Sequence, residues 1–406
     1  MRTVIIVYDQ AFLSGGAAKI AIGEAVGLKK AGWRVIFFSG IAPVSSDLTE
    51  NEVEVICLNE KHIGLTKDPK ALLKGIWNTN SRKQLEILLE SLSPKETIVH
   101  VHGWTKSLSS SIFLATYKKK FKTLITLHEY FTICGNGGLF DYKRNEICRR
   151  KPGGISCVLC NCDKRNYFHK IYRNVRQIVQ NLTLRLTKPG VIYITCFSEK
   201  HLSNLHFNVS NKYKLTNFVD ITKRSRIASE QNSDYVFIGR VSQEKGIELF
   251  CDAVTYASVK GVVIGDGPML NQCKDRYPQV EFVGWKSPDE MKAFIEKARC
   301  LIITSKWYET MGLTVIEMQQ YGIPCIVPYE CAPSEYIENE KNGFTYKIGD
   351  KESLYEAIIK TKDNIVIEKI SRDFYNNLNY DFYSIDTHIK KLSEIYNEEL
   401  NSVVRI

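Results

Sequence analysis

Long hydrophobic runs are missing from this sequence, as are solenoid repeats and low-complexity tracts. No apolar run approaches the roughly 20 residues that a membrane-spanning helix needs. The first apolar stretch, residues 3–8, is followed at once by Asp9, so the start does not have the apolar region of a secretory signal. These absences predict a cytoplasmic protein whose contact with a membrane, if any, is peripheral and at the inner face of the plasma membrane.

What is present indicates a globular protein of two domains. A chain of 406 residues can build two hydrophobic cores, and 44% hydrophobic with 25% charged residues is typical of folded proteins. The net charge of +10 favours an anionic partner, such as a nucleotide, a phosphorylated lipid, a membrane face or a nucleic acid. A merely basic surface fits the charge equally well.

Cysteine is abundant, with 12 residues, and five of them lie close together between positions 134 and 162. Structural disulfides are not expected in a reducing compartment. The pair Cys157 and Cys160 has the spacing of a metal knuckle, which Cys134 and Cys148 could complete as a structural zinc site. The alternatives are reduced or redox-labile thiols and a catalytic metal. Cys162 could replace a neighbouring ligand.

Strand-like stretches alternate with helical patterns from end to end, which predicts an α/β fold with parallel sheets covered on both faces. The first series occupies residues 3–8, 34–39, 53–58, 97–102, 122–128 and 191–197, and a second occupies 234–240, 260–266, 280–285, 300–305 and 323–328. We therefore predict two doubly wound, Rossmann-like domains that face each other across a cleft. The predicted boundaries are 1–216 for the first domain with a cysteine-rich insert at 131–165, 217–380 for the second domain, and 381–406 for a helix that packs back on the first domain.

The stretch "SKWYETMGLTVIEMQQYGIP", residues 305–324, places Glu309 and Glu317 on either side of a predicted helix start. The helix is expected from Gly312 to Tyr321, because Gly322 and Pro324 end it. The amide groups of Met311, Gly312 and Leu313 would then face the cleft and suit a phosphate. The plainer interpretation is a helix-start acid followed by a solvated one.

Three further turns of the second series follow strand ends. "FIGRVSQEKG" contains Gly239, Arg240 and Lys245, and these two cations match a diphosphate, although an ordinary basic loop is the alternative. "VIGDGPML" contributes Gly265 but lacks the third glycine of a dinucleotide fingerprint. "FVGW" offers main-chain groups at Val283 to a nucleobase.

In the first series, Gly15 and Gly16 open a helix after the first strand, in a loop that is no Walker motif. His102 and His128 follow two other strands of this series. A lone histidine is more often structural, but two at strand ends in a predicted cleft favour function.

These motifs, with "LHEY" and "NFVD", resemble the retaining glycosyltransferases of family 4, which have the GT-B fold and include bacterial surface-polysaccharide enzymes. The resemblance covers nearly the whole chain, although "ETMG" stands where the family usually has "EGFG". It implies that Arg240 and Lys245 bind the donor diphosphate, Glu309 contacts the sugar and Glu317 the ribose. It further implies that His128 lies near the anomeric carbon and Gly15 and Gly16 near the phosphates. By the same resemblance, residues 1–216 form the acceptor-binding domain, residues 217–380 form the nucleotide-sugar-binding domain, and no cofactor is required for catalysis. We assign His102 to the acceptor side.

The predicted function is a retaining transfer of sugar from a nucleotide-diphosphate donor to a hydroxyl of a lipid-linked or polysaccharide acceptor. A nucleotide-sugar epimerase of similar architecture is the alternative, and a degenerate transferase acting as a scaffold is a further one. A nucleic-acid-binding module would leave both large α/β units unexplained, so no nucleic acid is expected as a partner. A set of basic residues predicts peripheral contact with an anionic membrane, against the alternative of a solvated basic face: Lys143, Arg144, Arg149, Arg150, Lys151, Lys164, Arg165, Lys170, Arg173 and Arg176.

Overall fold

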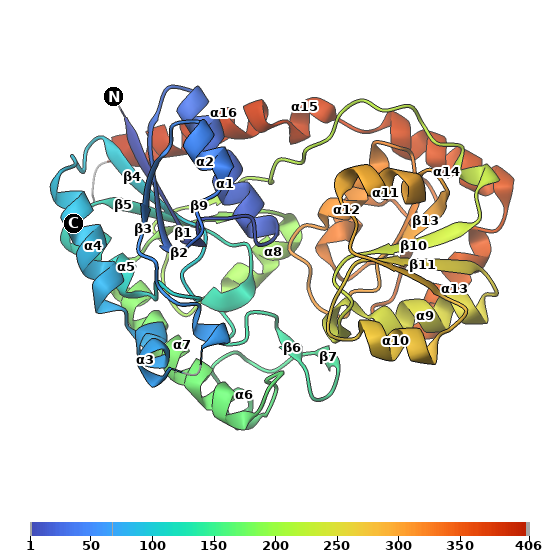
Figure 1. Ribbon diagram of the computed structural model, residues 1–406, viewed down its shortest axis with the longest axis horizontal. Coiled ribbons are helices and arrows are strands. Elements are labelled where there is room, and N and C mark those ends of the chain that lie inside the picture. The colour runs from blue at the N-terminus through green and yellow to red at the C-terminus, as the bar shows by residue number, and fades with distance from the viewer. Residues whose placement is uncertain (1, 67, 403–406) are drawn as a thin grey trace.

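The computed structural model describes residues 2–66 and 68–402 and has two domains that lie side by side (Figure 1). Each domain is built around one parallel sheet with helices on both faces. The predicted α/β fold with two doubly wound domains is confirmed. No helix in the described residues combines the length and hydropathy that crossing a membrane requires.

The N-terminal sheet has seven parallel strands in the order β3-β2-β1-β4-β5-β8-β9. Their bounds are β1 (Thr3–Gln10), β2 (Arg34–Ile41), β3 (Glu54–Cys57), β4 (Thr97–Val101), β5 (Lys122–Thr126), β8 (Gly190–Tyr193) and β9 (Lys212–Lys214). Every residue of β1 and β4 is buried, as expected for strands with helices on both faces. The order of the strands reverses between β1 and β4, and ligands of doubly wound sheets bind beyond the carboxyl ends at such a reversal.

Helices α1 (Gly16–Lys30), α2 (Ser46–Glu50), α3 (Pro69–Ile76), α4 (Thr79–Glu90), α5 (Ser111–Lys118), α6 (Ile155–Leu159), α7 (Tyr167–Thr187) and α8 (Cys196–Lys200) belong to the same domain. The last helix of the chain, α16 (Ile385–Asn401), returns to this domain after the short α15 (Tyr380–Tyr383) (Figure 1). Ile389, Leu392 and Tyr396 of α16 are part of the core that β1 and α1 form. The C-terminal helix thus packs on the first domain.

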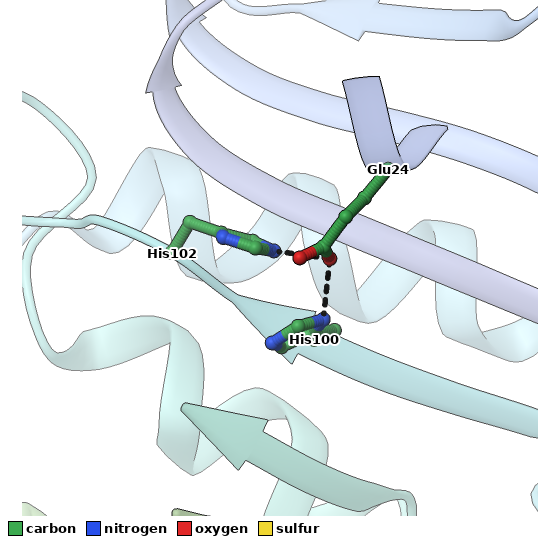
Figure 2. A group of neighbouring side chains, drawn as sticks. All are labelled: Glu24, His100 and His102. Atoms are coloured by element: carbon green, nitrogen blue, oxygen red, sulfur yellow. Dashed lines mark ion pairs between the residues drawn. The ribbon is translucent and has the colours of Figure 1, made fainter. Parts of the chain in front are cut away.

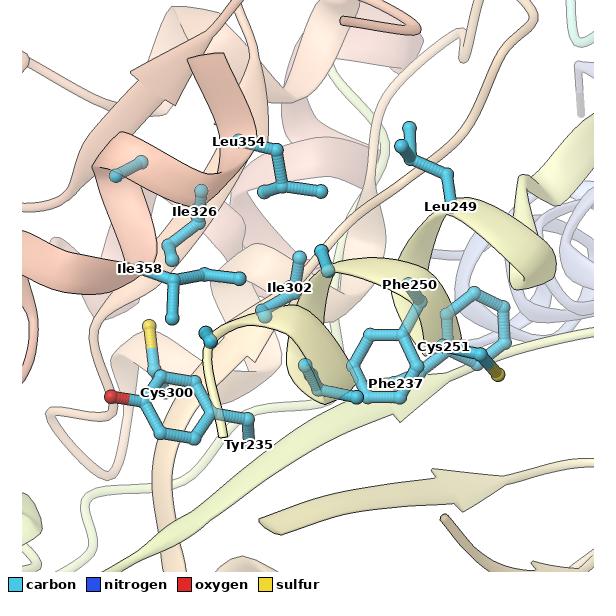
Figure 3. Close-up of a cluster of buried hydrophobic side chains, with 14 of the residues drawn as sticks. Tyr235, Phe237, Leu249, Phe250, Cys251, Cys300, Ile302, Ile326, Leu354 and Ile358 are labelled. Carbon is cyan, nitrogen blue, oxygen red and sulfur yellow. The ribbon is translucent and has the colours of Figure 1, made fainter. Parts of the chain in front are cut away.

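The C-terminal sheet has six parallel strands in the order β12-β11-β10-β13-β14-β15, with a reversal between β10 and β13. They are β10 (Asp234–Ile238), β11 (Lys260–Ile264), β12 (Glu281–Gly284), β13 (Ala298–Ile302), β14 (Cys325–Pro328) and β15 (Phe344–Tyr346), with helices α9 (Ile247–Tyr256), α10 (Leu270–Arg276), α11 (Pro288–Ile295), α12 (Leu313–Gln319), α13 (Lys351–Lys360) and α14 (Asn364–Asn376). Figure 3 shows part of one core of this domain, where Tyr235, Phe237, Phe250 and Ile358 pack together.

All predicted strands are present, but the structure adds elements. The short edge strands β9 and β15 were not predicted, and neither were α7 nor the hairpin of β6 (Phe140–Asp141) and β7 (Glu146–Ile147) in the cysteine-rich insert. Helix α12 is shorter than the predicted 312–321. Residues 215–228, which have no regular secondary structure, connect the two sheets at the predicted junction.

Candidate active site

A cavity of about 340 Å³ lies between the carboxyl ends of the two sheets. The N-terminal domain contributes four residues to its lining, namely Gly16, Ala17, His128 and Glu129. Asn217 lies at the junction, and the remaining lining comes from the ends of β10 and β13 and from the start of α12. The cavity therefore joins the two places at which the strand order reverses, as predicted from the fold class.

Most of the predicted donor-site residues line this cavity. From the C-terminal domain these are Gly239, Arg240, Lys245, Glu309, Met311, Gly312 and Leu313. They come from two separate chain segments, residues 239–245 and 309–313, which only the folded sheet brings together. Their roles in binding a donor stay predictions.

Five predicted residues do not line the cavity: Gly15, His102, Gly265, Val283 and Glu317. A side chain at Gly265 would collide with the carbonyl oxygen of Gly239, so Gly265 supports the neighbouring turn. Glu317 is partly buried on α12, and its pKa is raised because burial disfavours the charged form. Gly15, by contrast, is exposed in the loop before α1, where a Cβ atom would meet nothing within 4 Å.

Lys245 and Glu309 form an ion pair inside the cavity. The Lys245 ammonium also lies over the ring of Trp307, 5.3 Å from its centroid. The Glu309 amide donates a hydrogen bond to the sulfur of Cys331 at 3.2 Å. Burial opposes ionisation of Glu309, but the charge of Lys245 and hydrogen bonds from Lys245, Ser305 and Trp307 outweigh burial and lower its pKa. The carboxylate is thus held ionised and oriented by its neighbours.

Gly312, which precedes α12, needs to be glycine for two reasons. Its φ of 82° lies in the left-handed region, and a Cβ atom there would be 2.4 Å from the side chain of Pro333. This conformation turns the chain from the Glu309 loop into the helix, and Met311 and Leu313, the neighbours of Gly312 in the sequence, both line the cavity.

His128 is linked to a buried carboxylate through His102. The Nε2 atom of His128 lies 2.8 Å from Nδ1 of His102, and Nε2 of His102 lies 3.2 Å from Oε2 of Glu24 on α1. Figure 2 shows Glu24 between His102 and His100. His102 is only 4% exposed, so the prediction that it faces an acceptor is wrong in this structure. Its ring holds His128 from behind instead.

Glu24 is the centre of this network and was not predicted. It is 1% exposed, lies 3.3 Å from Nδ1 of His100, and is 2.9 Å from Nε2 of His388 on α16. Full burial disfavours the carboxylate, but the charge of His102 and hydrogen bonds from the three histidines outweigh it and hold the pKa of Glu24 well below its usual range. Burial, assisted by the charge of His102, lowers the pKa of His100 to about 4 and that of His128 well below its usual value.

The glutamate-histidine group does not have the character of a metal centre. Glu24, His100 and His102 are the one set of such ligand atoms within 4.8 Å of one another in the described part of the chain. Both nitrogens of His100 already have partners, the hydroxyl of Tyr396 at 2.6 Å and that of Thr126 at 2.7 Å. The group is therefore a hydrogen-bonded network that ties α1, β4 and α16 together.

Three sequence signals could have revealed more of the site. Glu24 is a lone acid on an apolar face of α1, which is unusual unless the acid is paired. Trp307 lies between the predicted strand at 300–305 and the predicted helix at 312–321, two residues before Glu309, and it lines the cavity. Glu129 directly follows His128 and lines the cavity.

The predicted zinc ligands are not assembled in this structure. Among the described residues, no three of the five clustered cysteine sulfurs lie within 4.8 Å of one another. Separate polar partners surround them: Cys160 donates to Asp141 at 3.3 Å, Cys134 donates to Asn136 at 3.1 Å, and Arg150 and Lys170 donate to Cys148 and Cys157.

Zinc binding by the cysteine segment stays a prediction. Metal analysis of the purified protein tests it, with about one zinc per chain expected and a loss of that zinc in Cys157→Ser, since a thiolate ligand is removed. Protein that is folded and free of stoichiometric metal would reject the prediction.

The two domains are held together around the cavity by polar contacts. Thr310 donates its hydroxyl to the carbonyl of His128 at 3.1 Å, and Thr195 donates to the carbonyl of Thr310 at 3.2 Å. The insert also reaches the second domain, because Gln243 donates to the carbonyl of Tyr142 at 3.1 Å. The loop that contains Glu309 is thus positioned from both domains.

Known proteins resemble the chain in sequence and in fold. Residues 219–377 match the family described as glycosyl transferases group 1. The chain is 23% identical over 227 residues to the UDP-Gal:alpha-D-GlcNAc-diphosphoundecaprenol alpha-1,3-galactosyltransferase of Escherichia coli, covering 50% of this chain and 56% of that protein. It is also 22% identical over 341 residues to an uncharacterized 41.2 kDa protein in the cps region of Klebsiella pneumoniae, covering 79% and 86% of the two chains.

Among solved structures, the Anabaena protein HepE in complex with UDP and glucose superposes with a TM-score of 0.67 at 13% identity, over 98% of this chain and all of that one. The chain spans little more than half the length of the galactosyltransferase, but nearly the whole of the solved structure. The second domain thus matches the group 1 glycosyl transferases in sequence, and the whole chain shares its two-domain fold with HepE.

Proposed function

We propose that the protein transfers a sugar from a nucleoside-diphosphate donor to a hydroxyl group of a lipid-linked or polysaccharide acceptor, with retention of the anomeric configuration. The main support is the arrangement of Lys245, Arg240 and Glu309 around one interdomain cavity. The named activity of the Escherichia coli relative, which concerns a diphosphoundecaprenol-linked acceptor, supports the lipid-linked choice.

Cleavage of a glycosyl–phosphate bond builds negative charge on the departing diphosphate. Arg240 can hold two phosphate oxygens with its planar guanidinium, and Lys245 supplies a compact positive charge. Both line the cavity from the loop after β10, so they would approach the diphosphate from the same side. Such fixed donors stabilise charge that develops in the transition state.

Glu309 would bind the sugar rather than form a covalent bond with it. One of its oxygens already accepts hydrogen bonds from Lys245 and Ser305, and its lowered pKa keeps it an acceptor for sugar hydroxyls. His128 faces it from the other domain with a lowered pKa, so it offers a neutral imidazole. This pairing supports a same-face displacement in which the leaving phosphate helps to deprotonate the acceptor.

Nucleotide binding provides a direct test that needs no acceptor. We expect UDP at about 100 times its dissociation constant to stabilise the folded protein by about 2.7 kcal/mol. UMP at the same concentration should stabilise it less, because the second phosphate is missing. Differential scanning fluorimetry with UDP, GDP and their monophosphates measures this. Equal shifts for diphosphates and monophosphates would contradict diphosphate binding by Arg240 and Lys245.

An epimerase would differ in its products. It would convert a nucleotide sugar into its isomer without an acceptor and without releasing nucleoside diphosphate. Chromatography of nucleotides after incubation with and without acceptor therefore separates the two activities.

A further inference from the structure

Helix α7 presents an apolar surface to solvent. Its exposed positions, apart from Arg185, all carry apolar or aromatic side chains, with Phe168 at 71%, Ile178 at 60% and Leu182 at 59% exposure. The complete set is Tyr167, Phe168, Ile171, Val175, Ile178, Leu182 and Leu186. These positions recur every three or four residues, so they form one stripe along the helix.

The opposite face of α7 is polar and points into the domain. Gln180 accepts a hydrogen bond from the indole of Trp104 at 2.9 Å and donates one to the carbonyl of Phe131 at 2.8 Å. Arg176 donates to the carbonyls of Thr105 and Gly135 at 3.1 and 3.3 Å. These bonds set the rotation of the helix. A typical surface helix has the reverse arrangement, with its apolar stripe facing the core.

Neighbouring elements extend the apolar stripe. On α6, Ile155 and Leu159 are 81% and 69% exposed. The hydroxyl of Tyr167 on α7 donates to the carbonyl of Val158 on α6. Leu73 on α3 is 67% exposed, and Tyr172 of α7 donates to the carbonyl of its neighbour Leu72. Figure 1 shows α3, α6 and α7 together at the lower edge of the N-terminal domain. We call this set, the exposed stripe of α7 with Ile155, Leu159 and Leu73, the α7 surface.

Along the segment that contains α6 and α7, the exposed charges have one sign. From residue 147 to 198 the only acid is Asp163, which is 0% exposed and lies 3.1 Å from Arg173. Exposed cations in this segment are Arg149, Lys151, Lys164, Arg165, Arg185 and Lys188. Lys170, Arg173 and Arg176, which the sequence suggested as part of a basic face, are instead directed inward to Cys157, Asp163 and backbone carbonyls.

We propose that the α7 surface docks the protein on an anionic membrane, with α7 lying in the plane of the interface. A helix of 21 residues is about 31 Å long, and its apolar stripe would enter the boundary of headgroups and acyl chains while the cations contact acidic lipids. A second copy of the chain fits less well. A symmetric pair would bring two cationic segments together with no exposed acid in them to neutralise the charge.

This inference extends the proposed function, because a lipid-linked acceptor is itself held in a membrane. Membrane docking is measured without any transfer reaction, so the docking surface and the proposed function can fail separately. If vesicles bind the protein and no sugar is transferred, only the proposed function fails. If a soluble acceptor is glycosylated and vesicles do not bind, only the docking surface fails.

Vesicle flotation of the full chain tests the proposal. We expect the protein to float with phosphatidylcholine vesicles that contain phosphatidylglycerol, and to bind pure phosphatidylcholine vesicles at least about tenfold more weakly because the cations lose their partners. The double substitution Ile178→Glu with Leu182→Glu should lower partitioning to the anionic vesicles by at least about tenfold, since two buried apolar contacts are lost and two anions are added.

The matched control is Ile365→Glu, at an 81% exposed isoleucine on α14 of the other domain, which should float like the wild type. Circular dichroism verifies folding, and Ile178→Ser with Leu182→Ser replaces the glutamate pair if that pair does not fold. Wild-type protein that stays with the soluble fraction overturns the proposal. An α7 variant that floats normally also overturns it. The same holds for an α7 variant whose lipid binding is unchanged and whose only difference from the wild type, in sedimentation velocity, is that a dimer dissociates.

Discussion

Replacing Lys245 with alanine should lower the turnover number for sugar transfer by at least about a hundredfold. Lys245 supplies a positive charge inside the interdomain cavity, where the proposed diphosphate would leave. Removing one such donor typically costs about 3–4 kcal/mol of transition-state stabilisation, which corresponds to two or three orders of magnitude in rate. Release of nucleoside diphosphate at saturating donor measures the effect.

The substitution also removes the partner of Glu309, so folding needs its own control. Lys292→Ala makes the same change on α11 at a lysine that is 65% exposed and 3.9 Å from Glu296. It should retain wild-type turnover, since exposed ion pairs contribute little to stability. If Lys245→Ala folds, as thermal unfolding would show, and still turns over donor at a near-normal rate, the assigned role of Lys245 is wrong.

Replacing Glu24 with glutamine should destabilise the N-terminal domain by about 1.5–3 kcal/mol, because buried histidine N–H groups would lose a charged acceptor. Glu24 lies between His100, His102 and His388, which come from β4, the loop after it and α16. Glutamine has nearly the same shape but lacks the negative charge. Urea unfolding followed by circular dichroism at neutral pH measures the change.

Glu90→Gln is the matched control for Glu24→Gln. Glu90 is 61% exposed and 2.8 Å from Lys119 in the same domain, so its loss should cost no more than about 1 kcal/mol. The pKa of Glu24 is depressed in the folded state, so its contribution is present above the unfolded pKa and is lost as the pH falls. Glu24→Gln should therefore flatten the acid loss of stability. An unfolding free energy equal to that of the wild type would show that the charge of Glu24 contributes nothing to stability.

Much of the fold could be predicted from local patterns. Stretches such as residues 3–8 and 97–102 are nearly continuous apolar strands, and the strands observed there begin at the predicted residues. The missed strands, β9 and β15, have three residues each at sheet edges. So short an edge strand is held mainly by one neighbouring strand and has little periodicity of its own.

The candidate site was predictable where residues follow strand ends directly. Gly239, Arg240 and Lys245 follow β10, and Glu309 lies between β13 and α12, so the rule for doubly wound sheets placed them in the cavity. His102 also follows a strand end but is buried behind His128. The rule locates the carboxyl end of a strand and does not say which way a side chain there points.

The order of strands and helices, the two-domain division and the residues at the strand ends could be derived from the amino acids alone, because they depend on side chains close together in the chain. Three features depended on tertiary structure: the pairing of Lys245 with Glu309, the position of Glu24 among three histidines, and the outward rotation of the apolar stripe on α7. Each joins residues far apart in sequence, so its energy exists only once the packed domains bring those residues within a few ångströms.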